Sequence, residues 1–86
     1  MFSATITVKN KTGLHARPAS QLVALCQKFE SDMRIVGGGA DIDPKSIISI
    51  LSGGIKNGTT IELTASGPDE QNAVQEVAAL IESFTE

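Results

Sequence analysis

Aromatic residues are scarce in this chain, which has three phenylalanines, no tryptophan and no tyrosine among 86 residues. Aliphatic side chains must therefore fill any core, and the 41% apolar content suffices for one small domain, residues 1–86. The lone cysteine, Cys26, excludes an internal disulfide and a cysteine-based metal cluster. No segment approaches the roughly 20 apolar residues of a membrane span, and no signal peptide is recognisable. We therefore expect a cytoplasmic protein without membrane insertion.

Basic residues are missing from the C-terminal third. All seven lysines and arginines lie within residues 1–57, together with four of the ten acids, and the other six acids lie in residues 58–86. The formal net charge is −3. An acidic chain with few aromatics is a poor candidate for nucleic-acid binding. The more basic part could still face an anionic ligand or an acidic partner.

The pattern of apolar residues predicts alternating strands and helices. Strict alternation indicates strands at 2–8, 33–36, 40–43 and 59–65, the last after an Asn57-Gly58 turn. Helical spacing indicates a helix from residue 16, a short one over 46–51, and a last one that opens at 67–70. The expected inner positions are Ala19, Leu22, Val23, Cys26 and Phe29, then Ile47, Ile50 and Leu51, then Val74, Val77, Ala78, Ile81 and Phe84. The order β-α-β-β-α-β-α favours a two-layer α/β sandwich, with helices on one face of a mostly antiparallel sheet.

The only histidine, His15, lies where the loop 10–14 ends and the first helix begins. The N–H groups of Ala16 and Arg17 belong to the first turn, where the helix supplies no acceptor, and they form an anion site with the helix dipole. The Arg17 guanidinium suits phosphate oxygens. A neutral imidazole there could attack a phosphoryl donor, while these groups stabilise the developing charge. A plain capping role for His15 accounts for the position equally well.

No carboxylate, second histidine or metal-ligand set is evident near this site to activate water. This argues against a small phosphatase that would use the same anion site. We therefore expect no metal and no cofactor, and the chemistry points to group transfer rather than hydrolysis.

Residues 13–19, Gly-Leu-His-Ala-Arg-Pro-Ala, resemble the active-site signature of the HPr family, phosphocarriers of the bacterial phosphoenolpyruvate-dependent sugar phosphotransferase system. The resemblance continues through Lys45-Ser46-Ile47, Ser52 and residues 65–67, and it covers essentially the whole chain. It implies an open-faced sandwich of a four-stranded antiparallel sheet with three helices on one face. It also implies that His15 accepts a phosphoryl group on Nδ1 from enzyme I, assisted by Arg17, and passes it to enzyme IIA domains. Such a protein is a carrier rather than a turnover enzyme.

The resemblance further implies regulatory and docking sites. Ser46 matches the serine that HPr kinase/phosphorylase modifies in many Gram-positive members, and it is equally expected as a helix N-cap. In the family, the short helix and the outer face of the first helix dock partners. The corresponding residues here are Ala16, Ser20, Ala24, Ile48 and Leu51. A carrier that must release its partners quickly is most simply a monomer.

Some positions depart from familiar members and leave alternatives open. Ala24 and Gln27 stand where enteric members carry lysines, and position 49 is serine, which weakens the basic rim that steers acidic partners. A nitrogen-regulatory branch of the same system therefore remains an alternative. A catabolite-regulatory interaction module acting through Ser46 is another. Family members of that type lack the active-site histidine, whereas this chain has His15.

Overall fold

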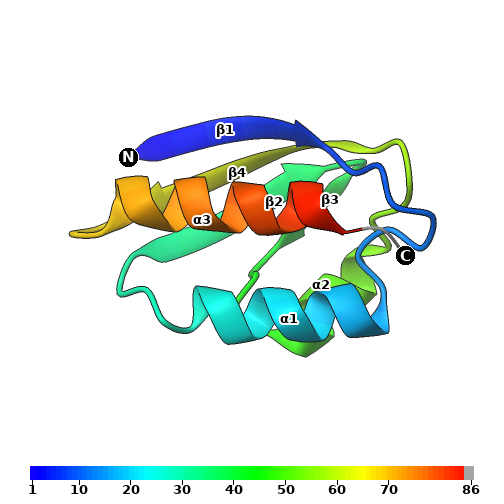
Figure 1. Ribbon diagram of the computed structural model, residues 1–86, viewed down its shortest axis with the longest axis horizontal. Helices are drawn as coiled ribbons and strands as arrows, with labels where there is room; N and C mark the ends of the chain where they lie inside the picture. The colour runs from blue at the N-terminus through cyan, green and yellow to red at the C-terminus, as the bar shows by residue number, and fades with distance from the viewer. Residues whose placement is uncertain (85–86) are drawn as a thin grey trace.

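The computed structural model describes residues 1–84 and confirms the predicted order of elements. The strands in this range are β1 (Phe2–Thr7), β2 (Asp32–Gly37), β3 (Ala40–Ile42) and β4 (Thr60–Ser66). They form one antiparallel sheet in the order β1-β4-β2-β3. One face of the sheet is covered by the helices (Figure 1), which are α1 (Ala16–Cys26), α2 (Ile47–Gly53) and α3 (Glu70–Ser83). The predicted open-faced two-layer sandwich is confirmed.

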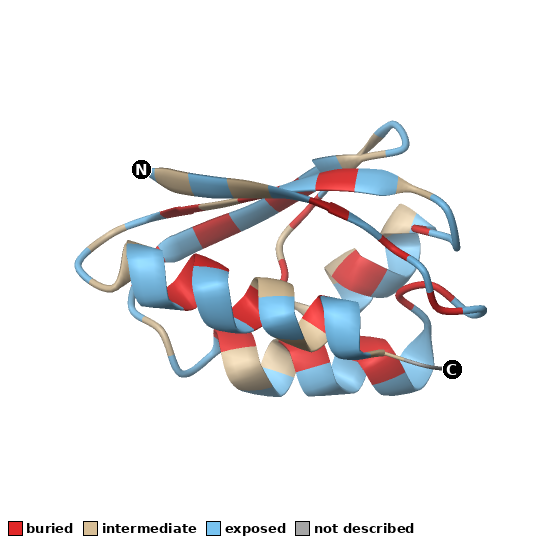
Figure 2. Cartoon of the chain, turned by 45° about the horizontal axis from the view of Figure 1, so that its top comes forward, coloured by how far each residue is buried: buried red, intermediate tan, exposed pale blue. Residues whose placement is uncertain are grey.

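A single aliphatic core lies between the sheet and the helices. Alternation along the strands is clear in β4, where Ile61, Leu63 and Ala65 are buried and the intervening Glu62 is exposed. Buried faces of the helices meet the buried face of the sheet (Figure 2). Each element contributes at least one core residue, for example Ile6, Leu22, Ile35, Ile42, Ile50, Leu63 and Val77. The other face of the sheet is mostly polar and exposed, as alternation predicts, and it includes the half-exposed Val36.

The predicted inner face of the short helix α2 is wrong at two of its three positions. Ile50 is fully buried, but Ile47 is 38% exposed and Leu51 is 45% exposed. The helix has only seven residues, and it contacts α1 on one side and β3 on another. So short a helix places one residue in the core, and its remaining apolar side chains face solvent.

Several element ends also differ from the predicted ones by one or more residues, and three of them concern residues expected inside an element. α1 ends at Cys26, so Phe29 lies beyond the helix, where it packs half-buried against the core. Phe84 likewise follows the last residue of α3 and packs against the core. Asp43 lies outside β3 because its N–H donates to Ser49 Oγ (2.8 Å), which ties it to α2. A local hydrogen bond therefore accompanies the early end of β3, and both phenylalanines reach the core from outside their helices.

Candidate phosphoryl-acceptor site

His15 is the N-cap residue of α1. Its backbone is extended, with φ −90° and ψ −166°, and its carbonyl accepts a hydrogen bond from the Ala19 N–H (2.7 Å). The imidazole makes no capping hydrogen bond, and the residue is exposed. A polar residue at an N-cap ordinarily serves the helix through its side chain. Capping therefore does not explain why a histidine stands here, and its ring is available to a partner in solution.

The first turn of α1 supports an anion beside this ring. Ala16 and Arg17 are its first two residues, and both are exposed. At these positions the helix provides no acceptor for the N–H groups, and its dipole is positive. Pro18 follows without an N–H, and α1 has no acidic residue in its first turn. Next to His15 the helix thus offers two first-turn backbone N–H groups, those of Ala16 and Arg17, that have no acceptor within the helix.

Hydrogen bonds hold the loop before His15, and we call these contacts the loop clamp, formed by Asn10, Gly13, Ile55 and Asn57. Asn10 Nδ2 donates to the Gly13 carbonyl (2.7 Å), and the Gly13 N–H donates back to the Asn10 carbonyl (3.2 Å). The N–H of the next residue, Leu14, donates to the Ile55 carbonyl (3.0 Å). Asn10, Gly13 and Leu14 are buried. The loop that leads to His15 is therefore buried and held by hydrogen bonds, whereas His15 itself is exposed.

Gly13 and Asn57 make this clamp possible. Gly13 has φ +61°, and a Cβ on it would lie 2.3 Å from the Ile55 carbonyl oxygen, so no other residue fits. Asn57 Nδ2 donates to the carbonyls of Lys9 (2.7 Å) and Asn10 (3.1 Å). From the sequence, Asn57 is expected only as part of a turn, and Asn10 is not singled out. Asparagine and glycine in residues 10–13 indicate a turn, but no sequence signal indicates the particular hydrogen bonds that Asn10 and Asn57 make.

Ser46 is the N-cap of α2, as predicted. Its Oγ accepts a hydrogen bond from the Ser49 N–H (3.3 Å), and its side chain is only partly buried. Lys45 beside it is held in place, because its Nζ donates to the Phe29 carbonyl (2.8 Å). The hydroxyl therefore serves the helix while remaining within reach of solvent.

The structure does not bring Ser46 next to His15. Gln27, the C-cap residue of α1, donates from Nε2 to the Lys45 carbonyl (3.3 Å), so α2 begins at the C-terminal end of α1. Ile55, which follows α2, bonds to the loop just before His15. The two sites therefore lie at opposite ends of α1, an 11-residue helix, and a helix of that size is about 16 Å long.

The expected docking residues are all exposed. Ala16, Ser20 and Ala24 lie about one turn apart on α1. Ile48 and Leu51 on α2 are 74% and 45% exposed. The two helices pack against each other. Apolar side chains that a folded chain leaves in water on adjoining helices are typical of a partner surface.

Neither a membrane span nor a metal centre is found in residues 1–84. No helix in this range is long and apolar enough to cross a bilayer. No group of three or more histidine, cysteine or acidic side chains among these residues is arranged to hold a metal ion.

Comparison with known proteins decides the family. The model of the family described as the PTS HPr component phosphorylation site matches residues 2–83. The chain belongs to the HPr family. The phosphocarrier protein HPr of Haemophilus influenzae is 35% identical over 81 residues, which are 94% of this chain and 95% of that protein. The HPr-like protein Crh of Bacillus subtilis is 37% identical over 82 residues, 95% of this chain and 96% of that protein.

A longer protein and a solved structure also match this chain. The multiphosphoryl transfer protein of Vibrio cholerae is 39% identical over 82 residues, and the match spans 92% of this chain but only 20% of that protein. The crystal structure of HPr from Thermoanaerobacter tengcongensis is 42% identical, with a TM-score of 0.91, and the match covers 96% of this chain and 93% of that one. Sequence and fold thus agree on an HPr-family phosphocarrier of the phosphotransferase system.

Proposed function

We propose that His15 carries the phosphoryl group in this phosphocarrier, accepting it from enzyme I and passing it to enzyme IIA domains. The observation that carries this proposal is an exposed imidazole at the N-cap of α1 that makes no capping hydrogen bond. The hydrogen-bonded loop before His15 holds this residue next to the first-turn N–H groups of Ala16 and Arg17. A nucleophile held beside an anion site suits phosphoryl transfer better than a structural role.

The transfer leaves the carrier unchanged after each cycle. The lone pair of the imidazole nitrogen, which we assign to Nδ1, attacks phosphorus. An N–P bond forms, the bond from phosphorus to the donor breaks, and that bonding pair stays with the donor. Charge on the three phosphoryl oxygens is stabilised by the N–H groups of Ala16 and Arg17 and by the Arg17 guanidinium. At the acceptor the same steps run in reverse and release His15, so the protein is a carrier rather than a turnover enzyme.

The docking surface for these partners is formed by Ala16, Ser20, Ala24, Ile48 and Leu51. Ile48 and Leu51 are its large apolar side chains, and both are exposed. The three residues of α1 are small and also exposed. An interface of this kind suits brief contacts in which each partner leaves after transfer. We assign the role to one 1–86 domain that acts as a cytoplasmic monomer. A single species of monomer mass in sedimentation at working concentration supports that assignment, and a dimer contradicts it.

Ser46 supports a second candidate function, regulation by a protein kinase such as HPr kinase/phosphorylase. Its hydroxyl is partly exposed at the N-terminus of α2, where a phosphate is favoured by the helix dipole. Because Ser46 lies at the far end of α1 from His15, its phosphate would act by adding charge to the docking surface. Similarity to Crh of Bacillus subtilis, whose solution structure is described as that of the catabolite repression HPr, supports this function as well. Sugar uptake and the nitrogen-regulatory branch use different IIA domains. The IIA domain that accepts the phosphoryl group therefore distinguishes these two alternatives.

The decisive experiment incubates the protein with phosphoenolpyruvate and catalytic enzyme I, followed by intact-mass measurement. We expect a gain of one phosphoryl group that is acid-labile, alkali-stable and absent from His15→Ala. The exposed ring makes no capping bond, so this variant should keep the wild-type circular dichroism spectrum. No adduct with a competent enzyme I contradicts the proposal, and rapid release of phosphate favours a phosphatase. An adduct on Ser46 that requires ATP and cell extract adds the regulatory function.

A further inference from the structure

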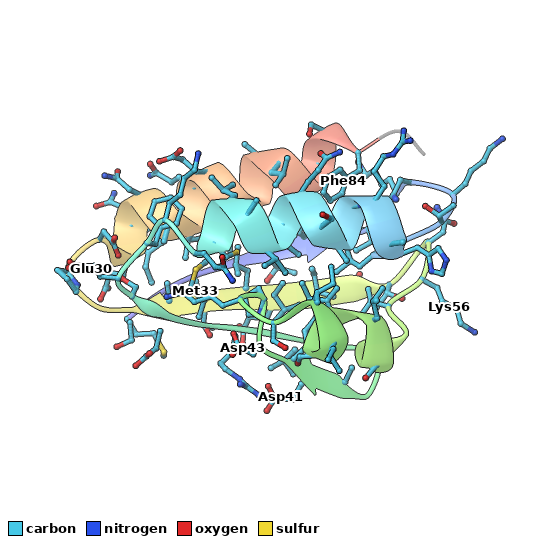
Figure 3. All side chains as sticks on the ribbon, turned by 90° about the horizontal axis from the view of Figure 1, so that it is seen from below. Glu30, Met33, Asp41, Asp43, Lys56 and Phe84 are labelled. Carbon is cyan, nitrogen blue, oxygen red and sulfur yellow. The ribbon has the colours of Figure 1, made fainter. Side chains whose placement is uncertain are left out.

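Asn57 and Gly58 form an exposed turn after α2, and they carry a chemistry that phosphoryl transfer does not use. The Thr59 N–H donates to the Lys56 carbonyl (3.1 Å), so this pair is the centre of the turn. Figure 3 shows Lys56, the residue just before the pair, at the end of the molecule where α1 begins. Of the three asparagines in the sequence, only Asn57 precedes a glycine. An asparagine in that position can lose its amide group spontaneously.

The reaction needs no enzyme and no reactant other than water. The Gly58 nitrogen attacks Cγ of Asn57, and a C–N bond forms that closes a cyclic imide. The bond from Cγ to Nδ2 breaks, and Nδ2 leaves as ammonia with the proton that the Gly58 nitrogen gives up. Water then opens the ring at either carbonyl and leaves aspartate or isoaspartate. Glycine permits the attack because no Cβ shields its nitrogen.

In the folded chain, the loop before α1 holds both groups that take part in this reaction. The attacking nitrogen, that of Gly58, donates its hydrogen to the Val8 carbonyl (2.6 Å). The leaving group, Nδ2 of Asn57, donates to the carbonyls of Lys9 (2.7 Å) and Asn10 (3.1 Å). Nucleophile and leaving group are therefore bonded to three consecutive carbonyls, and the reaction requires these bonds to break.

The backbone of the turn also keeps the two groups apart. Gly58 has φ +88°, whereas Asn57 does not have a positive φ, which is the type II pattern. In that pattern the first central residue has a ψ of about +120°. This angle turns the next nitrogen away from the preceding side chain, whereas attack on Cγ needs the two on the same side. The turn must therefore change its conformation before the amide can be lost.

We propose that Asn57 is a deamidation site, that its bonds to the loop before α1 protect it, and that deamidation keeps the loop clamp from closing again. Either product replaces the amide with a carboxylate, which accepts hydrogen bonds but donates none. It would face the carbonyls of Lys9 and Asn10, which are acceptors too. The modification therefore runs in one direction, and the loop before His15 loses an anchor.

The first measurement compares deamidation of the whole chain in buffer and in urea, at one temperature and mildly alkaline pH, by peptide mass mapping. Loss of three hydrogen bonds corresponds to roughly 100-fold, so we expect Asn57 to react about 100-fold more slowly in the folded chain. Asn72, which is exposed and precedes alanine, should stay unmodified in urea over the same time. Equal rates in the two solvents would overturn the protection, and an Asn57 that survives in urea would overturn the site.

Gly13→Ala and Gly54→Ala form a matched pair that tests the clamp. The two glycines have φ +61° and +62°, but only a Cβ on Gly13 would meet the segment before Asn57, at 2.8 Å from Lys56 Cα. We expect folded Gly13→Ala to deamidate about tenfold faster than wild type, and folded Gly54→Ala to react nearly like wild type. In urea all three chains should react alike. Equal rates for the two folded variants would contradict protection by the clamp.

The product is isolated by anion exchange, because one added negative charge changes the net charge from −3 to −4. Hydrogen exchange at the Leu14 and Gly58 N–H groups, both bonded across the two loops, should be about tenfold faster than in the amide form. Asn57→Asp, which reproduces the aspartate product, should behave in the same way. Unchanged exchange at both groups would show that the clamp closes again. These readouts involve no phosphoryl transfer, so the result is independent of the function proposed for His15.

Discussion

The two ends of the molecule both present backbone N–H groups to an anion, but only one end contains the anion. Away from His15, the Asp69 carboxylate accepts hydrogen bonds from the N–H groups of Glu30 (2.9 Å) and Ser31 (3.0 Å) and from the Ser31 hydroxyl. At the His15 end, the first turn of α1 has no acid of its own. One end is therefore completed within the chain, and the other is the place where we propose that the phosphoryl group of His15 lies.

At both ends a glycine lies so close to another segment of the chain that a larger residue would not fit. A Cβ on Gly67 would lie 2.7 Å from Ser31 Cα, and one on Gly13 would lie 2.3 Å from the Ile55 carbonyl oxygen. At the Asp69 end we expect this closeness to serve stability alone. At the His15 end it holds the loop that carries the ring for which we propose phosphoryl transfer, so there we expect it to serve function as well. Changes at the two ends should therefore separate stability from transfer, and the predictions below are ordered by their effect on transfer.

The largest effect is expected from Gly13→Ala. The new methyl group meets the Ile55 backbone, and the residue is held at φ +61°. Left-handed strain costs about 1–3 kcal/mol, and overpacking adds about 1–3 kcal/mol. Displacement of the His15 ring should slow phosphoryl acceptance by about 10- to 100-fold. Rapid-quench transfer from enzyme I, measured well below the unfolding temperature, checks this.

Gly54→Ala is the matched control for this strain. Gly54 has φ +62°, almost the angle of Gly13, but a Cβ added to it would meet nothing within 4 Å. We expect it to lose about 1–3 kcal/mol of unfolding free energy from the strain alone and to keep its transfer rate nearly unchanged. Equal transfer rates for the two variants would show that the close contact with Ile55 does not position His15.

A smaller effect is expected from Asn57→Ala. The change removes hydrogen bonds to the carbonyls of Lys9 and Asn10 but leaves the rest of the loop clamp in place. Each such bond contributes about 1 kcal/mol, so stability should fall modestly, and transfer should slow several-fold. Urea unfolding and quench kinetics measure both quantities. Asn72→Ala, an exposed change in the first turns of α3, is the control, and an equal loss of transfer there would contradict a positioning role for Asn57.

The His15 end was largely predictable because its signals are local. The change from alternating to helical spacing indicates that α1 begins near His15, and the same reasoning places Ser46 at the start of α2. Both N-caps are confirmed. The clamp was not predictable in full, because Asn57 and Lys9 are 48 residues apart in sequence. Periodicity carries no information about such a bond.

Exposure of α2 was mispredicted for a related reason. Spacing defines which residues share a face, but neighbouring elements decide whether that face is covered. Ile47 and Leu51 share a side with Ile50 by spacing, yet only Ile50 reaches the core of the described chain. The contacts of Asp69 escaped prediction too, since the sequence indicates only that the last helix opens at 67–70. The carboxylate of Asp69 bonds to Glu30 and Ser31, far away in the chain.

Asp69→Asn should leave transfer unchanged while altering stability in a pH-dependent way. The Ser31 hydroxyl, followed by the Glu30 N–H, favours the charged carboxylate and lowers the pKa of Asp69 from its ordinary value. An unfolded aspartate titrates near pH 3.9. Because the folded pKa is depressed, the contribution of this charge is fully present above about pH 4 and is lost as pH falls through the folded pKa.

The wild type should therefore be more stable than Asp69→Asn at neutral pH, and the difference should close as the solution is acidified below about pH 4. Urea titrations of both proteins across this range measure it. The pKa of Glu70 is also lowered, by its bond to the N-terminal amino group, but Glu70 titrates in both proteins and cancels in the difference. A difference that persists undiminished in acid would mean that Asp69 acts through packing. Slower transfer by this variant would mean that the two ends are coupled, and stability and function would then share one network.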